Sequence, residues 1–376
     1  MRHPLQPFDP RNFTPGALAR EKPWSFDAVT LDGARALVSD RDEIPPFLAE
    51  PLAPTGATVV ALDDLVRFTE RPVRAFLRQR LGISLGDFSQ DIADALPVEL
   101  DGLERWGVGR RLLDGVLDGA ALDACIAAEI ARGTLPPGRL ALPVIDRIRP
   151  VVEEIAGHAR RALGGDTAPE SMDVRVVLPD GRPLTGTVPS VRGDVLGNVT
   201  YSRVSARHRV GAWVRLLALS AAYPERRFSS VTVGRARSGA PDTASATIAR
   251  IPSVDRAEAL AHLGTLVDLW DRGMREPLPI ACEASAAYAR AASAGENPVT
   301  AAAKAWESGW NFPREDAELE HQLVFAGALA FADLLEEGPR ADERGDGWDE
   351  TDTTRFGRLA RRLWAGALAC EEVVDQ

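Results

Sequence analysis

The sequence predicts an α/β (α+β) fold, in which a mixed sheet is flanked by helices. Apolar and polar residues alternate at 171–178 and again at 184–191, with a Pro-Asp-Gly turn between them at 179–181. This pattern is typical of a β-hairpin. A helical pattern precedes the hairpin, and a third strand, a helix and a further strand follow it. Such an order favours a mixed fold over a helical bundle or a β-sandwich.

Residues 1–58 are expected to form an extended N-terminal segment, because proline, aspartate and arginine are frequent there and apolar residues show little periodicity. A helical subdomain is expected at 59–135. Its first helix contains Pro72, which predicts a kink or two short helices, since proline lacks the backbone donor and clashes with the preceding turn. The helices of this subdomain are expected at 61–81, 101–117 and 119–132.

An α/β core is expected at 136–275, and it holds the hairpin. Its other elements are expected at 141–163 (helix), 197–204 (strand), 207–223 (helix), 228–236 and 245–251 (strands) and 254–273 (helix). A helical region at 276–376 is expected to pack on this core, interrupted by an acidic, glycine-rich loop at 337–350. A chain of 376 residues buries about three quarters of its unfolded surface, which is enough for one large core or two smaller ones.

The balance of charge argues against a general affinity for nucleic acid. The chain carries a net charge of −11, whereas a free-standing DNA-binding protein normally has a basic face, because the release of counterions from phosphates drives its binding. A local basic groove is compatible with an acidic total. The 44 basic residues include only Lys22 and Lys304 as lysines, so almost all of the positive charge is carried by arginine.

Several other kinds of site are not indicated. Cys125, Cys282 and Cys370 lie far apart, which predicts neither a disulfide framework nor a zinc site. Neither a P-loop motif nor a GxSxG motif occurs, and we expect no cofactor. No apolar run approaches the length of a membrane span, and the N-terminus lacks the apolar stretch of a signal peptide. We therefore expect a cytoplasmic protein without a membrane partner.

Three short motifs in the expected core point to a known chemistry. They are GRLAL at 138–142, GTVP at 186–189 and VTYSR at 199–203. Their order resembles the helix and the two strands that carry the catalytic residues of metal-dependent nucleases of the PD-(D/E)XK type. Those enzymes need carboxylates that hold Mg²⁺, and a lysine that orients water and stabilises developing charge.

The resemblance implies that the catalytic positions are degenerate. Leu142 stands where the helix of active members has histidine, and Pro189 replaces the metal-binding aspartate. The third strand has Tyr201 and Arg203 and no carboxylate. Arg203 is not an easy substitute for the catalytic lysine, because the delocalised guanidinium of arginine is larger and has no accessible neutral form. We therefore expect a nuclease-like core with no catalytic residue and no metal ligand.

A second resemblance covers nearly the whole chain. Blocks of residues follow one another in the order found in the C-terminal third of RecC, the gamma subunit of exodeoxyribonuclease V (the RecBCD helicase–nuclease). They are HPLQPF at 3–8, ALDDLVRF at 61–68 followed by Pro72, PVELDGL at 97–103, WGVG at 106–109, EPLPI at 276–280, Trp306 and the stretch 314–325. The resemblance implies a nuclease-like fold that is inactive, contacts RecD and helps to split and route DNA strands.

The implied partners are RecB-like and RecD-like subunits, with DNA in the assembled complex. Arginines around the third strand and the helix after it are candidates for binding DNA or a partner: Arg203, Arg207, Arg209, Arg215, Arg226 and Arg227. The alternative interpretation is a solvated face in an arginine-rich protein. Trp306, Trp310 and Phe312 likewise form either a docking surface or part of the packing of the C-terminal helices.

The sequence leaves three functions open. The first is a non-catalytic scaffold and DNA-strand guide in double-strand break repair, as the RecC resemblance implies. The second is an active PD-(D/E)XK nuclease whose metal ligands have moved, for which Asp173 and Asp194 are the nearest acidic residues. The third is an interaction protein unrelated to DNA, which the net charge of −11 permits.

Overall fold

The computed structural model describes residues 3–39, 45–86, 99–164, 167–237, 245–310, 312–345 and 347–376. Residues 97 and 98 of the PVELDGL block, and residue 346 of the acidic loop, lie outside the described residues. The chain forms two compact units, Met1–Pro46 and Phe47–Gln376. Residues 47–58, expected in the N-terminal segment, thus belong to the larger unit. The further division of that unit into three regions stays a prediction.

The N-terminal unit contains helices in place of a wholly extended segment. The 3₁₀-helix η1 covers Pro10–Asn12, and α1 covers Ala28–Val38. Asp27 begins α1, because its side chain accepts a hydrogen bond from the backbone N–H of Val29 at 3.0 Å. The buried Asn12 donates from its side chain to two backbone carbonyls of the preceding turn. Side-chain caps of this kind, rather than apolar periodicity, determine the local structure here.

The larger unit begins with the short strand β1 (Val60–Ala61) and a helical run that Pro72 interrupts, as expected. The run consists of α2 (Leu62–Glu70), α3 (Pro72–Ala75) and the π-helical turn η2 (Phe76–Arg80). Pro72 is the first residue of α3, where its missing N–H costs nothing, and Arg71 leaves the helical conformation at φ −151°. One face of the run is fully buried and includes Leu65, Phe68 and Phe76.

A mixed sheet forms the centre of this unit. Besides β1, its strands are β2 (Glu170–Val177), β3 (Pro183–Arg192), β4 (Val195–Arg203), β5 (Ser229–Arg235), β6 (Ala246–Ile251) and β7 (Glu372–Asp375). The strand order is β1-β3-β4-β5-β6-β7, with β2 paired to β3 as the expected hairpin. The pairs β1–β3 and β4–β5 are parallel, and the other pairs are antiparallel. β1 and β7 were not expected, because each is too short to show alternation.

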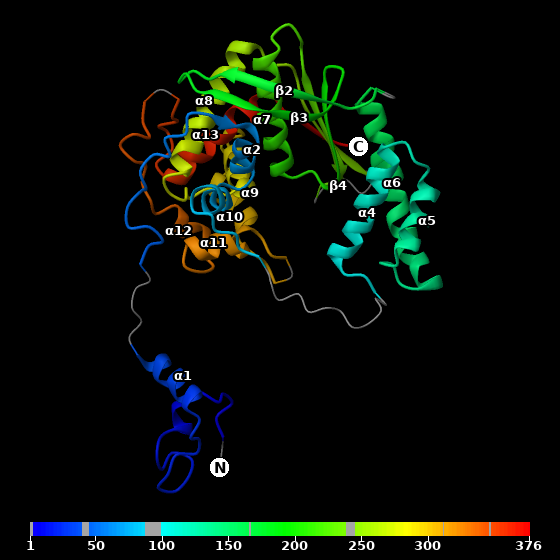
Figure 1. The fold of residues 1–376 in the computed structure, drawn as a ribbon. Helices are drawn as coiled ribbons and strands as arrows, with labels where there is room; N and C mark the ends of the chain where they lie inside the picture. The colour runs from blue at the N-terminus through cyan, green and yellow to red at the C-terminus, as the bar shows by residue number, and fades with distance from the viewer. Residues whose placement is uncertain are drawn as a thin grey trace. The chain divides into compact units, whose positions relative to one another are not determined.

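Helices cover both faces of the sheet (Figure 1). On one side lie α4 (Gly102–Leu117), α5 (Leu122–Arg132), the 3₁₀-helix η3 (Gly138–Ala141) and α6 (Leu142–Ala162); on the other lie α7 (Ala206–Ala222), α8 (Arg256–Gly273) and α13 (Arg355–Cys370). Val231, Val233 and Ile248 of the sheet belong to the core under α4 and α6. The mixed, helix-covered sheet is confirmed. The order α6, β2, β3, β4, α7, β5 is compatible with a PD-(D/E)XK core.

The remaining elements are short helices of the C-terminal region. They are α9 (Cys282–Ser293), α10 (Pro298–Trp306), η4 (Glu315–Ala317), α11 (Leu319–Val324) and α12 (Phe331–Leu334). The helices α9, α10, α11 and α12 contribute to the same core as α7, α8 and α13. None of the helices in the described part of the chain has the length and apolar character that crossing a bilayer would need.

Candidate functional site

Strand β3 contains a bulge at the position predicted to have lost the metal-binding aspartate. The register with β2 shifts between Glu170 and Met172, and Pro189 and Ser190 together face a single residue of β2. Ser190 has φ of 63°, in the left-handed region. Pro189 is exposed and cannot donate a hydrogen bond to the ladder. Position 189 therefore offers neither a carboxylate nor a regular strand conformation.

Tyr201, on the third strand of the expected core, is a packing residue. Its side chain is 5% exposed and lies against α4, where a Cβ on Gly109 would come within 2.2 Å of the ring. The guanidinium carbon of Arg235 lies 5.6 Å from the ring centroid, which is a cation–π distance. Burial raises the pKa of the Tyr201 phenol. Helix α4 therefore covers β4 at Tyr201, one of the four positions predicted to be degenerate.

The other two positions predicted to be degenerate lie at the surface. Leu142 is the first residue of α6 and is 50% exposed. Arg203 is the last residue of β4 and is also exposed. Leu142 and Arg203, like Pro189 and Tyr201, have no carboxylate. Their side chains are therefore not ligands that Mg²⁺ prefers. The assignment of these four positions to a former active site stays a prediction.

The nearest carboxylates are held by other contacts. Asp173 on β2 accepts a hydrogen bond from the Thr187 hydroxyl at 2.7 Å, and Asp194, in the turn before β4, forms an ion pair with Arg226 at 2.8 Å. Among the residues that the structure describes, no three His, Cys, Asp or Glu side chains converge as metal ligands. A nuclease with moved ligands would have to recruit Asp173 or Asp194 away from these partners.

Arg207 and Arg209, two of the candidate binding arginines, are engaged within the fold. Arg207 forms an ion pair with Glu318, in the loop before α11. Arg209 is 6% exposed, forms an ion pair with Glu371 and lies over the ring of Trp364 at 5.4 Å. These arginines hold the C-terminal region to α7, and the burial of Arg209 keeps it from reaching a DNA backbone from where it lies.

The other candidate arginines have more open positions. Arg215 lies 3.9 Å from a carboxylate oxygen of Glu70, and Arg226 also stacks over Phe228 at 4.6 Å. Arg203 and Arg227 are exposed. The six arginines thus do not form one continuous exposed surface. A role for the exposed members in binding DNA or a partner stays a prediction.

Two glutamates from distant segments act in sequence at the start of α7, just after the third strand: Glu283 contacts α7, and Glu315 contacts the start of α9. Glu283 accepts hydrogen bonds from the backbone N–H groups of Ala206 and Arg207, at 3.2 and 3.4 Å. Glu315 in turn accepts from the N–H groups of Glu283 and Ala284 at the start of α9, at 2.9 and 2.8 Å. Each carboxylate satisfies donors that a helix leaves unpaired at its N-terminus. We call this pair of contacts the cap relay.

Glu315 is the buried end of the cap relay. It is 3% exposed, and burial raises its pKa to about 7, against the effect of its two backbone hydrogen bonds and of Arg207, 3.6 Å away. His321 contacts the backbone oxygen of Glu315 at 2.6 Å. The stretch 314–325, which resembles a block of RecC, therefore contacts the starts of α7 and α9.

The aromatic residues of the C-terminal region divide between core and surface. Trp306 is 1% exposed, and its indole N–H donates to the backbone oxygen of Leu329 at 2.7 Å. Trp310 and Phe312 are 99% and 73% exposed. Packing is therefore the correct interpretation for Trp306. The docking surface stays a prediction for Trp310 and Phe312.

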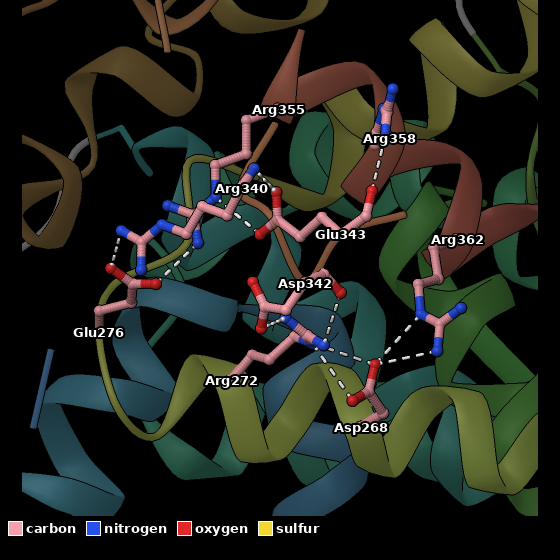
Figure 2. Close-up of polar contacts among 9 residues, drawn as sticks. All are labelled: Asp268, Arg272, Glu276, Arg340, Asp342, Glu343, Arg355, Arg358 and Arg362. Atoms are coloured by element: carbon pink, nitrogen blue, oxygen red, sulfur yellow. Dashed lines mark hydrogen bonds and ion pairs between the residues drawn. The ribbon is translucent and has the colours of Figure 1, made fainter. Parts of the chain in front are cut away.

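A buried ion-pair network anchors the acidic loop (Figure 2). Arg355, at the start of α13, is 2% exposed and contacts Glu276, Glu337 and Glu343 at 2.7 to 2.8 Å. Glu276 begins the EPLPI block and also pairs with Arg340. The guanidinium of Arg355 thus joins three segments, and the block that resembles RecC has a structural role here.

A second part of the network lies along α8 (Figure 2). Asp268 accepts hydrogen bonds from Arg272 at 3.1 Å and from Arg362 at 2.9 Å. Both guanidinium groups lie over the ring of Trp348 in the acidic loop, that of Arg272 at 5.2 Å and that of Arg362 at 4.3 Å from the ring centroid. Arg272 also pairs with Asp342 at 2.7 Å. The loop is therefore fixed to α8 and α13 by charge as well as by stacking.

One basic feature is not among the candidate binding residues of the sequence analysis. Four arginines line a pocket of about 320 Å³. Arg67 belongs to α2, Arg74 to α3 and Arg78 to η2, and Arg71 lies between α2 and α3. Their spacing of four, three and four residues is the helical signal that could have revealed a shared face.

Comparisons with known proteins agree with the second resemblance. The sequence model of a family described as "RecC C-terminal domain" matches residues 57–293. The RecBCD enzyme subunit RecC of Mycolicibacterium smegmatis is 39% identical over 375 residues, covering 99% of this chain and 33% of the relative. RecC of Mycobacterium tuberculosis is 37% identical over 369 residues, covering 98% and 32%. RecC of Escherichia coli is 25% identical over 297 residues, covering 78% and 24%. The chain spans about a third of the length of the first two relatives.

Proposed function

The chain belongs to the RecC family, and from that premise we propose that it acts as the non-catalytic C-terminal part of a RecC-type subunit. In this proposal it is a scaffold and DNA-strand guide in a RecBCD-type helicase–nuclease, and serves double-strand break repair. Its partners are RecB-like and RecD-like subunits, with DNA in the assembled complex. Such a complex works on the chromosome, so the proposal places the chain in the cytoplasm.

The observation that carries the non-catalytic role is the state of the four expected catalytic positions. A bulge with Pro189 lies in β3, and Tyr201 is buried under α4. Leu142 and Arg203 offer no carboxylate. Hydrolysis of a phosphodiester with Mg²⁺ needs oxygen ligands that fix the ion and stabilise the charge that develops. The side chains at these positions do not supply them.

The scaffold role draws support from how the unit is tied together. The cap relay joins the start of α7 to α9 and to Glu315, and the Arg355 network joins three further segments. Long-range contacts of this kind favour one rigid arrangement of the C-terminal region on the sheet. A rigid body suits a subunit that positions its partners, because little conformational entropy is then lost on assembly.

Co-purification tests the scaffold role. The affinity-tagged chain is produced together with RecB-like and RecD-like subunits of the same organism, and the bound fraction is resolved by size-exclusion chromatography. We expect at least one of the two subunits to elute with the chain. The scaffold role is wrong if the chain is folded and neither subunit elutes with it.

A nuclease assay tests the alternative of an active enzyme with moved ligands. The purified chain is incubated with linear duplex and single-stranded DNA and Mg²⁺, and we expect both substrates to stay intact. Cleavage that disappears in Asp173→Ala or Asp194→Ala would overturn the non-catalytic role. Cleavage that persists unchanged in both variants would indicate a contaminating nuclease. Repeating the assay on independently purified chain would then remove the cleavage.

A further inference from the structure

The pocket on α2, α3 and η2 is built on a rigid base. The arginines Arg67, Arg71, Arg74 and Arg78 share one face of the helical run, and the stripe spans roughly 16 Å at the helical rise per residue. The opposite face is fully buried and includes Val66, Val73 and Leu77. We call these four residues the arginine stripe. Their backbone positions are fixed by the core of the unit.

The wall of the pocket is also fixed. Gln79 completes the lining, and its side-chain amide donates to the backbone oxygen of Asp64 at 3.0 Å. Its amide oxygen accepts from the indole N–H of Trp270 at 2.9 Å. The π-helical turn η2 places Arg78 and Gln79 on this rim. Single π turns within helices occur frequently at functional sites.

The charge of the pocket is opposite to that of the protein. The chain has a net charge of −11, yet the residues that line this pocket comprise four arginines, one glutamate, one glutamine and one alanine. Arginine presents planar donors that match the oxygens of a phosphate two at a time. A concentration of four guanidinium groups in one concave site favours an anionic ligand with several phosphates.

The arginine stripe is incompletely neutralised. Arg74 forms an ion pair with the buried Glu320, whereas Arg67 reaches Asp64 only at 3.8 Å and is 69% exposed. Arg71 is half-buried, and within the described ranges no carboxylate lies at ion-pairing distance from it. Burial, and then the guanidinium of Arg207, lower the pKa of Arg71, while the carboxylates of Glu318 and Glu320 act in the opposite direction from beyond ion-pairing distance. A bound anion would supply the direct ion pair that Arg71 lacks.

Glu70 is the one acidic residue of the lining. Its carboxylate lies against Gly211 of α7, where a Cβ would approach the Glu70 oxygen to 2.4 Å, and 3.9 Å from Arg215. Burial raises the pKa of Glu70. Its negative charge lies beside the arginine stripe and repels an anion bound there. Removal of the Glu70 charge should therefore strengthen the binding of that anion.

We propose that the arginine stripe binds consecutive phosphates of a single DNA strand. The proposal deepens the function proposed above and rests on it for the identity of the anion, because DNA is the polyanion that a RecC-type subunit guides. No aromatic side chain lines the pocket, so the bases have no stacking platform there. Binding is therefore independent of sequence and sensitive to salt.

Fluorescence anisotropy measures the binding of a fluorescein-labelled oligo-dT to the full chain at several salt concentrations. The oligonucleotide has about 20 nucleotides, because sites for single strands cover about 4–16 nucleotides. The double variant Arg71→Gln, Arg78→Gln is expected to raise the Kd about tenfold. It should reduce the slope of log K against log salt by about 1.4, which corresponds to two phosphate contacts on a single strand. Circular dichroism confirms that the variant is folded.

A matched control removes the same charge from the opposite side of the sheet. Arg147 and Arg161 lie on α6, and both are exposed. The double variant Arg147→Gln, Arg161→Gln is expected to change the Kd by less than about twofold, the remainder being long-range charge that salt screens. Glu70→Gln is expected to tighten binding about two- to threefold, which is the direction that removal of a neighbouring repulsive charge gives.

The outcomes separate this inference from the proposed function. If the wild-type chain fails to bind the oligonucleotide, or both double variants weaken binding equally, the inference is wrong while co-purification still tests the scaffold. If the stripe variant binds DNA normally but no longer elutes with the partner subunits, the stripe is a protein interface and the inference is also wrong. Loss of oligonucleotide binding with intact assembly supports it.

Discussion

The Nε atom of Arg355 lies 2.8 Å from a carboxylate oxygen of Glu343, and the two side chains are 2% and 0% exposed. Glu343 belongs to the acidic loop and Arg355 to the first turn of α13. A charge buried this deeply remains stable only while its partners are present. The pair is therefore the most deeply buried of the contacts that hold the loop to the rest of the larger unit.

Arg355→Ala is expected to lower the free energy of unfolding by about 3–5 kcal/mol, because it leaves buried carboxylates without a counter-charge. Urea unfolding followed by tryptophan fluorescence measures the effect. Arg149→Ala is the control: Arg149 pairs with Asp123 at 2.6 Å, but the two side chains are 37% and 82% exposed. That variant should lose far less stability, because solvent screens an exposed ion pair. Equal losses in the two variants would show that the network is not a buried one.

Gly109→Ala tests the packing of α4 against the third strand. Alanine normally stabilises a helix interior by about 0.5–1 kcal/mol over glycine. Here the added Cβ would lie 2.2 Å from the Tyr201 ring, so we expect a net loss of about 1–3 kcal/mol from overpacking. Gly157→Ala on α6 is the matched control, since its Cβ would meet Arg161 at an ordinary 3.6 Å. Differential scanning calorimetry should show the first variant melting below wild type and the second at or above it.

The carboxyl of Glu315 predicts a dependence of stability on pH. Its pKa is about 7 in the folded chain, above the ordinary value of 4.5. The folded state therefore holds the proton more tightly than the unfolded state. The stability contributed by this group is full below pH 4.5 and is lost as the pH rises through 7.

Glu315→Gln removes that titration. The free energy of unfolding of the variant, minus that of wild type, should rise between pH 4.5 and pH 8 by an amount on the order of 3 kcal/mol. Urea unfolding at each pH measures the difference. A curve for Glu315→Gln that runs parallel to that of wild type would mean that burial does not control this carboxyl.

Trp306→Ala and Trp310→Ala separate packing from surface exposure. Trp306 is 1% exposed and Trp310 is 99% exposed. The first variant should lose about 3–5 kcal/mol, because truncation of a buried aromatic leaves a cavity, while the second should stay within about 0.5 kcal/mol. Thermal melting monitored by circular dichroism compares them. A large loss for Trp310→Ala in the isolated chain would show that the side chain has a partner within the fold.

The elements that the sequence predicts best are those whose pattern is local. The hairpin of β2 and β3 and the helix α7 were expected within one or two residues of their ends, because alternation and helical periodicity are properties of neighbouring residues. Strand β7 has four residues and no such pattern. Its pairing with β6 depends on backbone donors that lie more than 100 residues away in the sequence.

The environment of a charged side chain is harder to predict. Arg209 and Glu371 are separated by 162 positions, and nothing near Arg209 in the sequence reveals that it is buried. The same holds for Trp306 and Trp310, which are four positions apart and have opposite exposures. Periodicity could have identified the arginine stripe, because all of its members lie on one short helical run.

The cap relay has a consequence for chimaeric proteins. Replacing the C-terminal helical region with that of a relative would exchange Glu283 and Glu315, while the N–H groups at the start of α7 would remain those of the host. A graft that lacks either glutamate would leave a buried helix end with unpaired donors. Functional recombination between relatives should therefore favour junctions that keep α7, α9 and η4 from a single parent.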